Sequence, residues 1–318
     1  MVPSSASPLR LVLPERGRGI ADCVGNTPLL RIRLFEREAP GLAVYAKAEF
    51  MNPGGSVKDR PALRMLREGE RTGALTRDRV ILDSTSGNTG VAYAMLGAAF
   101  GHRVTLVMPA NVSEERRQLC EAYGATIVFS DPQEGSDGAI LRCREVHDAN
   151  PDAYFVPDQY NNPANWQAHY DTTGVEIWEQ TRGTVTHFLA GLGTSGTFVG
   201  CTRRLRAYNR KVQCISLEPD DAFHGLEGLK FMAAAIVPGI YDPALADRRL
   251  YGPTGDAYAL GRELALREGI LAGHSSGLAL WGVRALIREG LTDGVVVVIF
   301  SDRGDRYLSS GLFGAAGR

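Results

Sequence analysis

The sequence has no excess of charge of either sign: its 318 residues include 35 basic and 36 acidic side chains. Proteins that bind nucleic acid or membrane surfaces usually carry a basic excess, so we expect neither kind of partner. No apolar run is long enough to span a bilayer. The chain also lacks a fixed-period repeat and any low-complexity tract, which excludes solenoid folds.

Cysteine is scarce as well, and its five residues form no metal-ligand pattern (Cys23, Cys120, Cys143, Cys201 and Cys214). There is no C-x-x-C pair, and no histidine stands at ligand spacing, so we expect buried, reduced side chains and no metal site. Residues 1–19 are rich in Ser, Pro and Arg, without an apolar run long enough for a signal sequence. We therefore expect a cytoplasmic protein with a loose leader.

Strand-like and helix-like segments alternate along most of the chain. Val295–Phe300 is apolar on both faces, as buried parallel strands are. The alternation predicts an α/β fold with doubly wound sheets, in which ligands bind beyond the carboxyl ends of strands. The Pro- and Asn-rich segment 156–163 is the expected domain seam. The predicted strands are 44–49, 80–83, 104–108, 125–129, 186–190, 212–218 and 295–300, and the predicted helices are 57–72, 89–100, 114–123, 137–147 and 198–206.

One lysine stands where a positive charge is disfavoured. Residues 52–55 are turn-forming, and Ser56 followed by Asp59 has the form of a capping box, so Lys58 falls in the first turn of a predicted helix. The helix dipole is positive there, and it should lower the pKa of the lysine. A neutral amine can attack an aldehyde and later carry protons. The alternative is an ordinary exposed helix lysine.

The loop at residues 83–90, Asp-Ser-Thr-Ser-Gly-Asn-Thr-Gly, follows a predicted strand and precedes a helix. Its hydroxyls, amide and backbone N–H groups suit an anion, either a carboxylate or a phosphate. The alternative is an elaborate helix cap. Residues 273–277, Gly-His-Ser-Ser-Gly, precede another helix, and a serine there either donates to a heteroaromatic nitrogen or caps the helix.

The loop at residues 191–197, Gly-Leu-Gly-Thr-Ser-Gly-Thr, satisfies the pattern G-x-G-x-x-G. Glu218 ends the next predicted strand 22 residues beyond Gly196, as a nicotinamide-dinucleotide site requires. Three hydroxyl residues on the same loop favour a phosphate monoester instead. A lysine kept neutral, a phosphate loop, a carboxylate loop and a serine together indicate pyridoxal phosphate.

These motifs, in this order, resemble those of the cysteine synthases, which are fold-type-II pyridoxal-phosphate enzymes (the tryptophan synthase β-like fold). The resemblance covers about residues 25–313 and rests on Asn-Thr-Pro-Leu at 26–29, Asn-Pro-Gly-Gly-Ser-Val-Lys-Asp-Arg at 52–60, and the loops at 85–90, 193–197 and 275–277. It implies two doubly wound domains with the cofactor in the cleft between them. Residues 1–45 and 160–318 would form the large cofactor-holding domain, and 46–159 a smaller mobile domain that binds the substrate carboxylate.

The resemblance also assigns roles to single residues. Lys58 would be catalytic and form the imine with pyridoxal 5'-phosphate, Asn88 would bond the ring hydroxyl, and Ser275 would meet the pyridine nitrogen. The phosphate would be held by Gly193, Thr194, Ser195, Gly196 and Thr197. The substrate carboxylate would be held by Thr85, Ser86, Thr89 and Gln159. Lys230 stands where relatives that use phosphoserine carry a phosphate-binding arginine.

The implied reaction is a β-replacement that makes L-cysteine from O-acetylserine or O-phosphoserine and a sulfur donor, through an aminoacrylate. The implied partners are these small molecules and a second copy of the chain. Asp83-Ser84 stands where the sulfhydrylases often carry Glu-Pro. The sequence around Lys230 lacks the form usual in bacterial enzymes that use acetylserine, so the identity of the leaving group stays open. Alternatives are condensation with homocysteine, as in cystathionine β-synthases, a nicotinamide-dinucleotide oxidoreductase, and a regulatory protein that binds cofactor without turnover.

Overall fold

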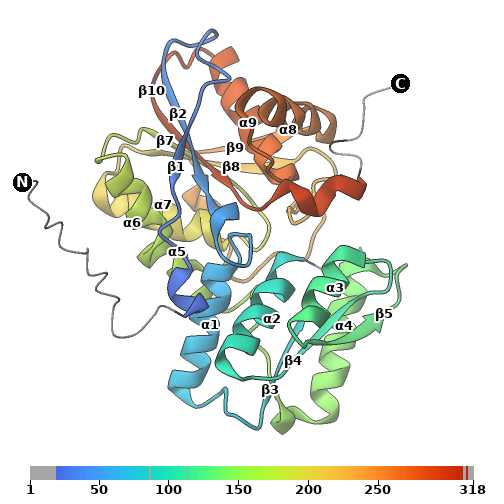
Figure 1. The fold of residues 1–318 in the computed structure, drawn as a ribbon. Helices are drawn as coiled ribbons and strands as arrows, with labels where there is room; N and C mark the ends of the chain where they lie inside the picture. Colours follow the sequence, from blue (N-terminus) through green and yellow to red (C-terminus); the bar gives the residue numbers. More distant parts are fainter. Residues whose placement is uncertain (1–18, 86, 113, 311–312, 314–318) are drawn as a thin grey trace, which may run out of the picture.

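The chain folds into two α/β units, each built around one sheet (Figure 1). The structure, a computed structural model, describes residues 19–85, 87–112, 114–310 and 313. The six-stranded sheet has the order β1-β2-β10-β7-β8-β9, and the four-stranded sheet has the order β5-β4-β3-β6. All neighbouring strands are parallel except β1 and β2, which are antiparallel.

The strands are β1 (Leu29–Ile32), β2 (Gly41–Ala48), β3 (Val80–Ser84), β4 (Val104–Pro109), β5 (Thr126–Ser130), β6 (Tyr154–Phe155), β7 (His187–Gly191), β8 (Gln213–Pro219), β9 (Arg248–Gly252) and β10 (Asp293–Phe300). The α-helices are α1 (Asp59–Thr72), α2 (Asn88–Phe100), α3 (Glu114–Ala122), α4 (Gly135–Ala149), α5 (Ala164–Asp171), α6 (Thr173–Gln180), α7 (Gly196–Tyr208), α8 (Thr254–Glu268) and α9 (His274–Arg288). Short 3₁₀ helices are η1 (Ile20–Cys23), η2 (Glu49–Met51), η3 (Pro151–Ala153), η4 (Pro243–Leu245) and η5 (Gly304–Ser310).

The central strand β10 shows why the larger sheet is covered on both faces. Because alternate side chains of a strand point to opposite faces, its apolar run supplies two cores. Val296 and Val298 pack into the core with α8 and α9, whereas Val297 and Ile299 pack into the core with α6 and α7. The prediction of a buried parallel strand and a doubly wound sheet is therefore confirmed.

The four-stranded sheet is also covered on both faces. Ile81 of β3 and Leu106 of β4 share a core with α1 and α2, while Leu82 and Val107 face α4. Strand β2 continues through Ala48 in the larger sheet, beside β10. The division of the chain at residues 46 and 159, and the mobility of the smaller domain, remain predictions.

Four of the five cysteines are buried, as expected, and all five are free thiols. Cys23 differs because it ends η1 at the surface, where its Sγ lies 3.7 Å from the carbonyl oxygen of Gly19. Among the described residues, no cluster of three or more potential ligands is placed to hold a metal ion. None of the helices within these ranges is long and apolar enough to cross a membrane.

One carboxyl group, that of Asp83, lies in the core at the end of β3, with only 4% of its surface exposed. Burial raises its pKa from 3.8 to about 7, and the nearby Asp158 adds to the rise, although the Ser84 N–H donates to Oδ1 at 2.8 Å and opposes it. Because the folded pKa lies above the unfolded one, the stability that protonated Asp83 contributes is lost as the pH rises from 3.8 to about 7, and little more is lost above that range.

We therefore expect Asp83→Asn to stabilise the apoprotein by about 2 kcal/mol more at pH 8 than at pH 5. Urea unfolding at the two pH values measures the difference. Asp220→Asn, which alters an exposed carboxylate, is the matched control. An equal effect of Asp83→Asn at both pH values would contradict the assignment.

Candidate active site

Lys58 immediately precedes α1 and is its N-cap residue, with no side-chain cap bond. The predicted capping box is wrong. Ser56 pairs with Asp302 in an isolated antiparallel bridge, and the Val57 N–H donates to the carbonyl of Ser301 at 2.7 Å. This stretch of backbone is tied to the end of β10 and cannot form the first helical turn. Asp59, in turn, accepts from the Gly54 N–H at 2.5 Å.

The pKa of Lys58 is lowered, as the sequence predicts, but the main cause is burial rather than the helix terminus. The carboxylate of Asp302 opposes this shift. Lys58 lines a cavity, and no hydrogen bond or ion pair from its Nζ joins it to another described residue. The amine is therefore partly removed from water, which favours its neutral form.

The residue two positions after Lys58 anchors this turn. Arg60 is buried, and its Nε and Nη2 each lie 2.7 Å from a carboxylate oxygen of Glu49. Its Nη1 also donates to Glu176 at 2.6 Å, and Glu176 accepts a further ion pair from Lys47 at 2.6 Å. A two-pronged guanidinium–carboxylate pair fixes direction as well as distance. Arg60, which belongs to the same motif as Lys58, therefore fixes this turn to Glu49 and Glu176.

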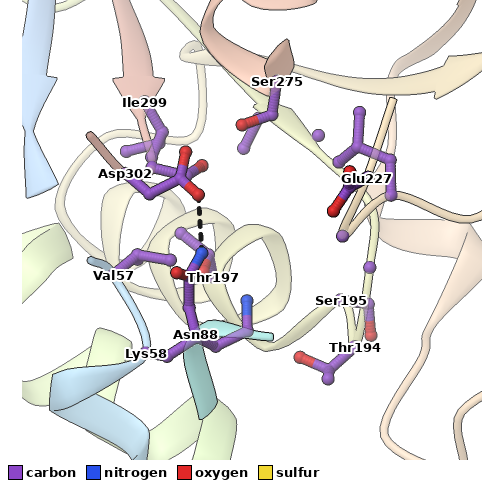
Figure 2. Close-up of a pocket in the computed structure, with 16 residues that line it drawn as sticks. Val57, Lys58, Asn88, Thr194, Ser195, Thr197, Glu227, Ser275, Ile299 and Asp302 are labelled. Carbon is purple, nitrogen blue, oxygen red and sulfur yellow. Dashed lines mark hydrogen bonds between the residues drawn. The ribbon is translucent and has the colours of Figure 1, made fainter. Parts of the chain in front are cut away.

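Two adjoining cavities meet at Lys58. The inner cavity, of about 50 Å³, and the outer cavity, of about 270 Å³, share Lys58, Asn88, Gly193 and Thr194. The inner cavity is also lined by Ser195, Thr197 and Ser275 (Figure 2), and the outer one by Thr85, Thr89, Gln159 and Lys230. Gly196 begins α7 without lining either cavity. Ser86 lies outside the described residues.

The loop at residues 193–197 connects the carboxyl end of β7 with the N-terminus of α7. Two of its glycines are required by their neighbours: a Cβ on Gly193 would lie 2.2 Å from the carbonyl of Gly228, and one on Gly196 would lie 1.9 Å from Asn165 Oδ1. Ser195 adopts a left-handed φ of 70°, which is strained for serine. Its buried Oγ has no hydrogen-bond partner in the described structure. The loop therefore presents hydroxyl and N–H groups to a ligand.

Two side chains of helix α5 form hydrogen bonds with the threonine hydroxyls of this loop. Asn165 Nδ2 donates to Thr194 Oγ1 at 3.1 Å, and His169 Nε2 lies 3.2 Å from Thr197 Oγ1. Burial lowers the pKa of His169 to about 3, so the imidazole is neutral at physiological pH. It orients the loop by hydrogen bonding without adding charge.

The loop at residues 85–89 follows β3 and leads into α2. Thr89 Oγ1 donates to Gln159 Oε1 at 2.8 Å, which leaves the amide N–H groups of Gln159 for the outer cavity. Thr85 Oγ1 accepts from the Gly87 N–H at 3.3 Å. Thr85, Thr89 and Gln159, the described residues expected to hold the substrate carboxylate, therefore all line the outer cavity. Their role in binding remains a prediction.

Lys230 lines the outer cavity, with its Nζ 5.2 Å from the centre of the Tyr160 ring. Burial lowers its pKa, and the carboxylate of Asp137 opposes the shift. Ser275 lies in the first turn of α9, facing the inner cavity. The predicted residues therefore come from distant parts of the sequence and lie together beyond the carboxyl ends of the strands of both sheets.

Sequence reasoning missed the segment that follows β10. Asp302 lines the inner cavity and is almost fully buried, and Arg306 and Tyr307 follow in η5. Asn88 Nδ2 donates to Asp302 Oδ2 at 2.6 Å (Figure 2). The available signal was position, because residues 301–307 directly follow a predicted buried strand, where ligands bind in such folds.

Glu218, whose position in the sequence suggested a nicotinamide-dinucleotide site, is buried and accepts a hydrogen bond from the backbone. Its Oε2 accepts from the Met232 N–H at 2.9 Å, and burial raises its pKa. The carboxylate fastens the loop after β8 instead of facing a ribose. The geometry therefore favours the phosphate-monoester alternative for the loop at residues 191–197.

Comparison with known proteins agrees with this geometry. The sequence profile described as "Pyridoxal-phosphate dependent enzyme" matches residues 20–302. The chain belongs to this family. It is 50% identical over 299 residues to a cysteine synthase of Aquifex aeolicus, covering 92% of this chain and 91% of the relative. It is 43% identical over 293 residues to cysteine synthase B of Escherichia coli, covering 92% and 94%.

The fold comparison gives the same result. The crystal structure of a cysteine synthase from Entamoeba histolytica superposes with a TM-score of 0.90 at 32% identity, covering 100% of this chain and 96% of the other. The fold-type-II assignment made from sequence is therefore confirmed, as is pyridoxal phosphate as the cofactor.

The residues of the inner cavity fit this cofactor. A buried, unpartnered serine hydroxyl and a helix N-terminus suit its phosphate. Lys58 offers a partly desolvated amine to its aldehyde, and Ser275 offers a hydroxyl from the opposite wall (Figure 2). We propose these contacts as the binding mode.

Lys58 should be the only attachment point of pyridoxal phosphate. The chain has four lysines, so borohydride reduction of the holoprotein followed by peptide mapping can locate the label among Lys47, Lys58, Lys211 and Lys230. We expect the label at Lys58, no label in Lys58→Ala, and full labelling in Lys211→Ala, which alters an exposed lysine. A label at any other lysine in the wild-type protein would refute the assignment.

Proposed function

We propose that this protein makes L-cysteine by β-replacement on O-acetylserine or O-phosphoserine with a sulfur donor. The observation that supports this most strongly is the convergence of Lys58, the loop at residues 193–197 and the loop at residues 85–89 on two connected cavities. The similarity to cysteine synthases over nine-tenths of the chain supports the same conclusion.

The substrate carboxylate binds in the outer cavity, against Thr85, Thr89 and the amide of Gln159. We extend this set to Ser86 on the resemblance alone. Hydroxyl and amide donors hold a carboxylate without a fixed counter-charge. Lys58 lines the same cavity, so a substrate held there would lie within its surroundings.

Bound pyridoxal phosphate supplies an electron sink next to the substrate α-carbon. Lys58, once free, takes the α-proton: the C–H bond breaks and a new N–H bond forms at Nζ. The electron pair of the broken C–H bond forms a double bond between the α- and β-carbons while the β-substituent departs as acetate or phosphate. The sulfur donor then bonds to the β-carbon, and Lys58 Nζ returns its proton to the α-carbon. Ser275 gives the pyridine nitrogen a neutral partner, which keeps the electron sink weak and favours loss of the β-substituent together with the proton.

The leaving group would lie near the charged residues of the outer cavity. Arg116 and Lys230 both line it, and Glu227 forms an ion pair with Arg116 at 2.5 Å. Because Glu227 already neutralises Arg116, Lys230 is the cation available to a phosphate. We therefore propose that Lys230 contributes to phosphoserine binding and little to acetylserine binding.

Steady-state rates with acetylserine and with phosphoserine, each with sulfide, test the reaction and this role. In Lys230→Ala we expect kcat/KM for phosphoserine to fall about tenfold, the value of one partly buried charge contact, and that for acetylserine to change less than twofold. Lys211→Ala should leave both rates unchanged. Equal losses with both substrates would refute the role of Lys230.

The same assay separates the donors and the classes of function. Formation of cystathionine with homocysteine, in place of cysteine with sulfide, would overturn the proposed donor. A yellow protein without turnover of either serine ester would overturn the enzyme assignment.

We further propose that the protein acts in the cytoplasm as a homodimer, which the resemblance to cysteine synthases supports. Sedimentation velocity of the holoprotein measures the assembly. A single species at the mass of one chain, 34.4 kDa, would contradict it.

A further inference from the structure

Both ends of the Asn88 side-chain amide are held by the segment that follows β10. Its Nδ2 donates to Asp302 Oδ2 at 2.6 Å, and its Oδ1 accepts from Arg306 Nη1. Figure 2 shows Asn88 below Asp302 in the inner cavity, with this first hydrogen bond between them. Neither Asp302 nor Arg306 belongs to the motifs that identified the site from sequence.

The chemistry of the two partners fixes which way the amide faces. A guanidinium only donates hydrogen bonds, so the atom of Asn88 that faces Arg306 must be its oxygen. Asn88 must therefore turn its nitrogen towards Asp302 and its oxygen towards Arg306. Burial raises the pKa of Asp302, and the hydrogen bonds from Tyr307 and Asn88 and the charge of Arg306 oppose that rise. With one Nδ2 hydrogen used, the other is left to donate into the cavities that Asn88 lines.

Both partners are themselves anchored to the larger sheet and to the turn before Lys58. Asp302 Oδ2 also accepts from the Tyr307 hydroxyl at 2.5 Å, and the Gly273 N–H donates to the Asp302 carbonyl at 3.0 Å. Arg306 Nη2 donates to the carbonyl of Gly54. A Cβ on Gly273 would lie 2.1 Å from Asp302 Oδ1, so only glycine leaves room for this carboxylate.

We propose that Asp302 and Arg306 are positioning residues that hold Asn88 so that it presents an N–H to the ring hydroxyl of pyridoxal phosphate. The inference rests on the cofactor site proposed above and adds to it a specificity for a hydrogen-bond acceptor at that ring position. Asn88 makes the contact, whereas Asp302 and Arg306 act through Asn88. The arrangement also ties α2, from the unit with the four-stranded sheet, to the turn that carries Lys58.

The test is a double-mutant cycle on cofactor affinity, measured by absorbance titration of the apoprotein with pyridoxal phosphate. We expect Asp302→Asn, which keeps the shape and removes the charge, to raise the Kd about tenfold and to shift the absorption maximum of the bound cofactor. In an Asn88→Ala background, the same change should raise the Kd by a clearly smaller factor, because only the direct effect of the Asp302 charge on Lys58 is left.

Two further variants complete the design. Arg306→Lys keeps the charge and loses the forked donor, so we expect the same loss of affinity and the same dependence on Asn88. Arg303→Lys alters a neighbouring arginine whose Nε donates to the Phe50 carbonyl and which lines neither cavity, so it should leave the Kd unchanged. Thermal melts of each apoprotein, followed by circular dichroism, confirm folding.

If Asp302→Asn does not fold, Tyr307→Phe replaces it, because it removes only the hydroxyl that donates to Asp302; we expect a smaller rise in Kd that is again reduced by Asn88→Ala. An equal loss of affinity with and without Asn88 would overturn the proposal, as would no loss at all. If the cycle shows this coupling but the wild-type protein makes no cysteine, the result supports the positioning role and contradicts the proposed reaction.

Discussion

The position of the Lys58 amine depends on a buried ion pair. Arg60 is held by Glu49 at the end of β2 and by Glu176 of α6, and all three side chains are largely removed from solvent. Removing one partner of such a pair typically costs about 3–5 kcal/mol, because a charge is left buried without compensation. Lys58 is only two residues away in sequence. The ion pair therefore fixes the start of α1 against the larger sheet, and with it the direction of the lysine.

The chemistry of the site follows from what surrounds that lysine. Burial favours the neutral amine, and Asp302 partly restores the charged form, so the two effects oppose each other at the atom that, in the proposed mechanism, must both lose and gain a proton. The only other charged residue that lines the inner cavity in the described structure is Glu227, which is paired with Arg116. Hydroxyls, N–H groups and a neutral His169 surround the loop proposed to bind the phosphate. In that proposal the anion would be held by oriented dipoles rather than by a competing lysine or arginine.

Much of the fold was readable from the sequence because the central strands are apolar on both faces. The seven predicted strands and five predicted helices all form, with ends displaced by three residues at most. The strands β1, β6 and β9 were missed. β1 and β9 lie at sheet edges, β6 has only two residues, and all three are partly exposed, so none shows the two-faced apolar pattern. The capping box at Ser56 was wrong because a local pattern was overridden by pairing with Ser301 and Asp302.

By itself the sequence determined the types of functional group available: one lysine after a glycine turn, two hydroxyl-rich loops before helices, and a serine before another. These depend on short-range turn and helix chemistry, which is written in neighbouring residues. Only the tertiary structure decided that Asp302 and Arg306 hold Asn88, that Glu218 faces a backbone N–H, and that burial is the main cause of the lowered lysine pKa. The contacts of Asn88 join residues more than two hundred positions apart, the contact of Glu218 joins a strand to a loop residue 14 positions later, and the lysine pKa depends on the exclusion of water. None of these interactions produces a periodic pattern in the sequence.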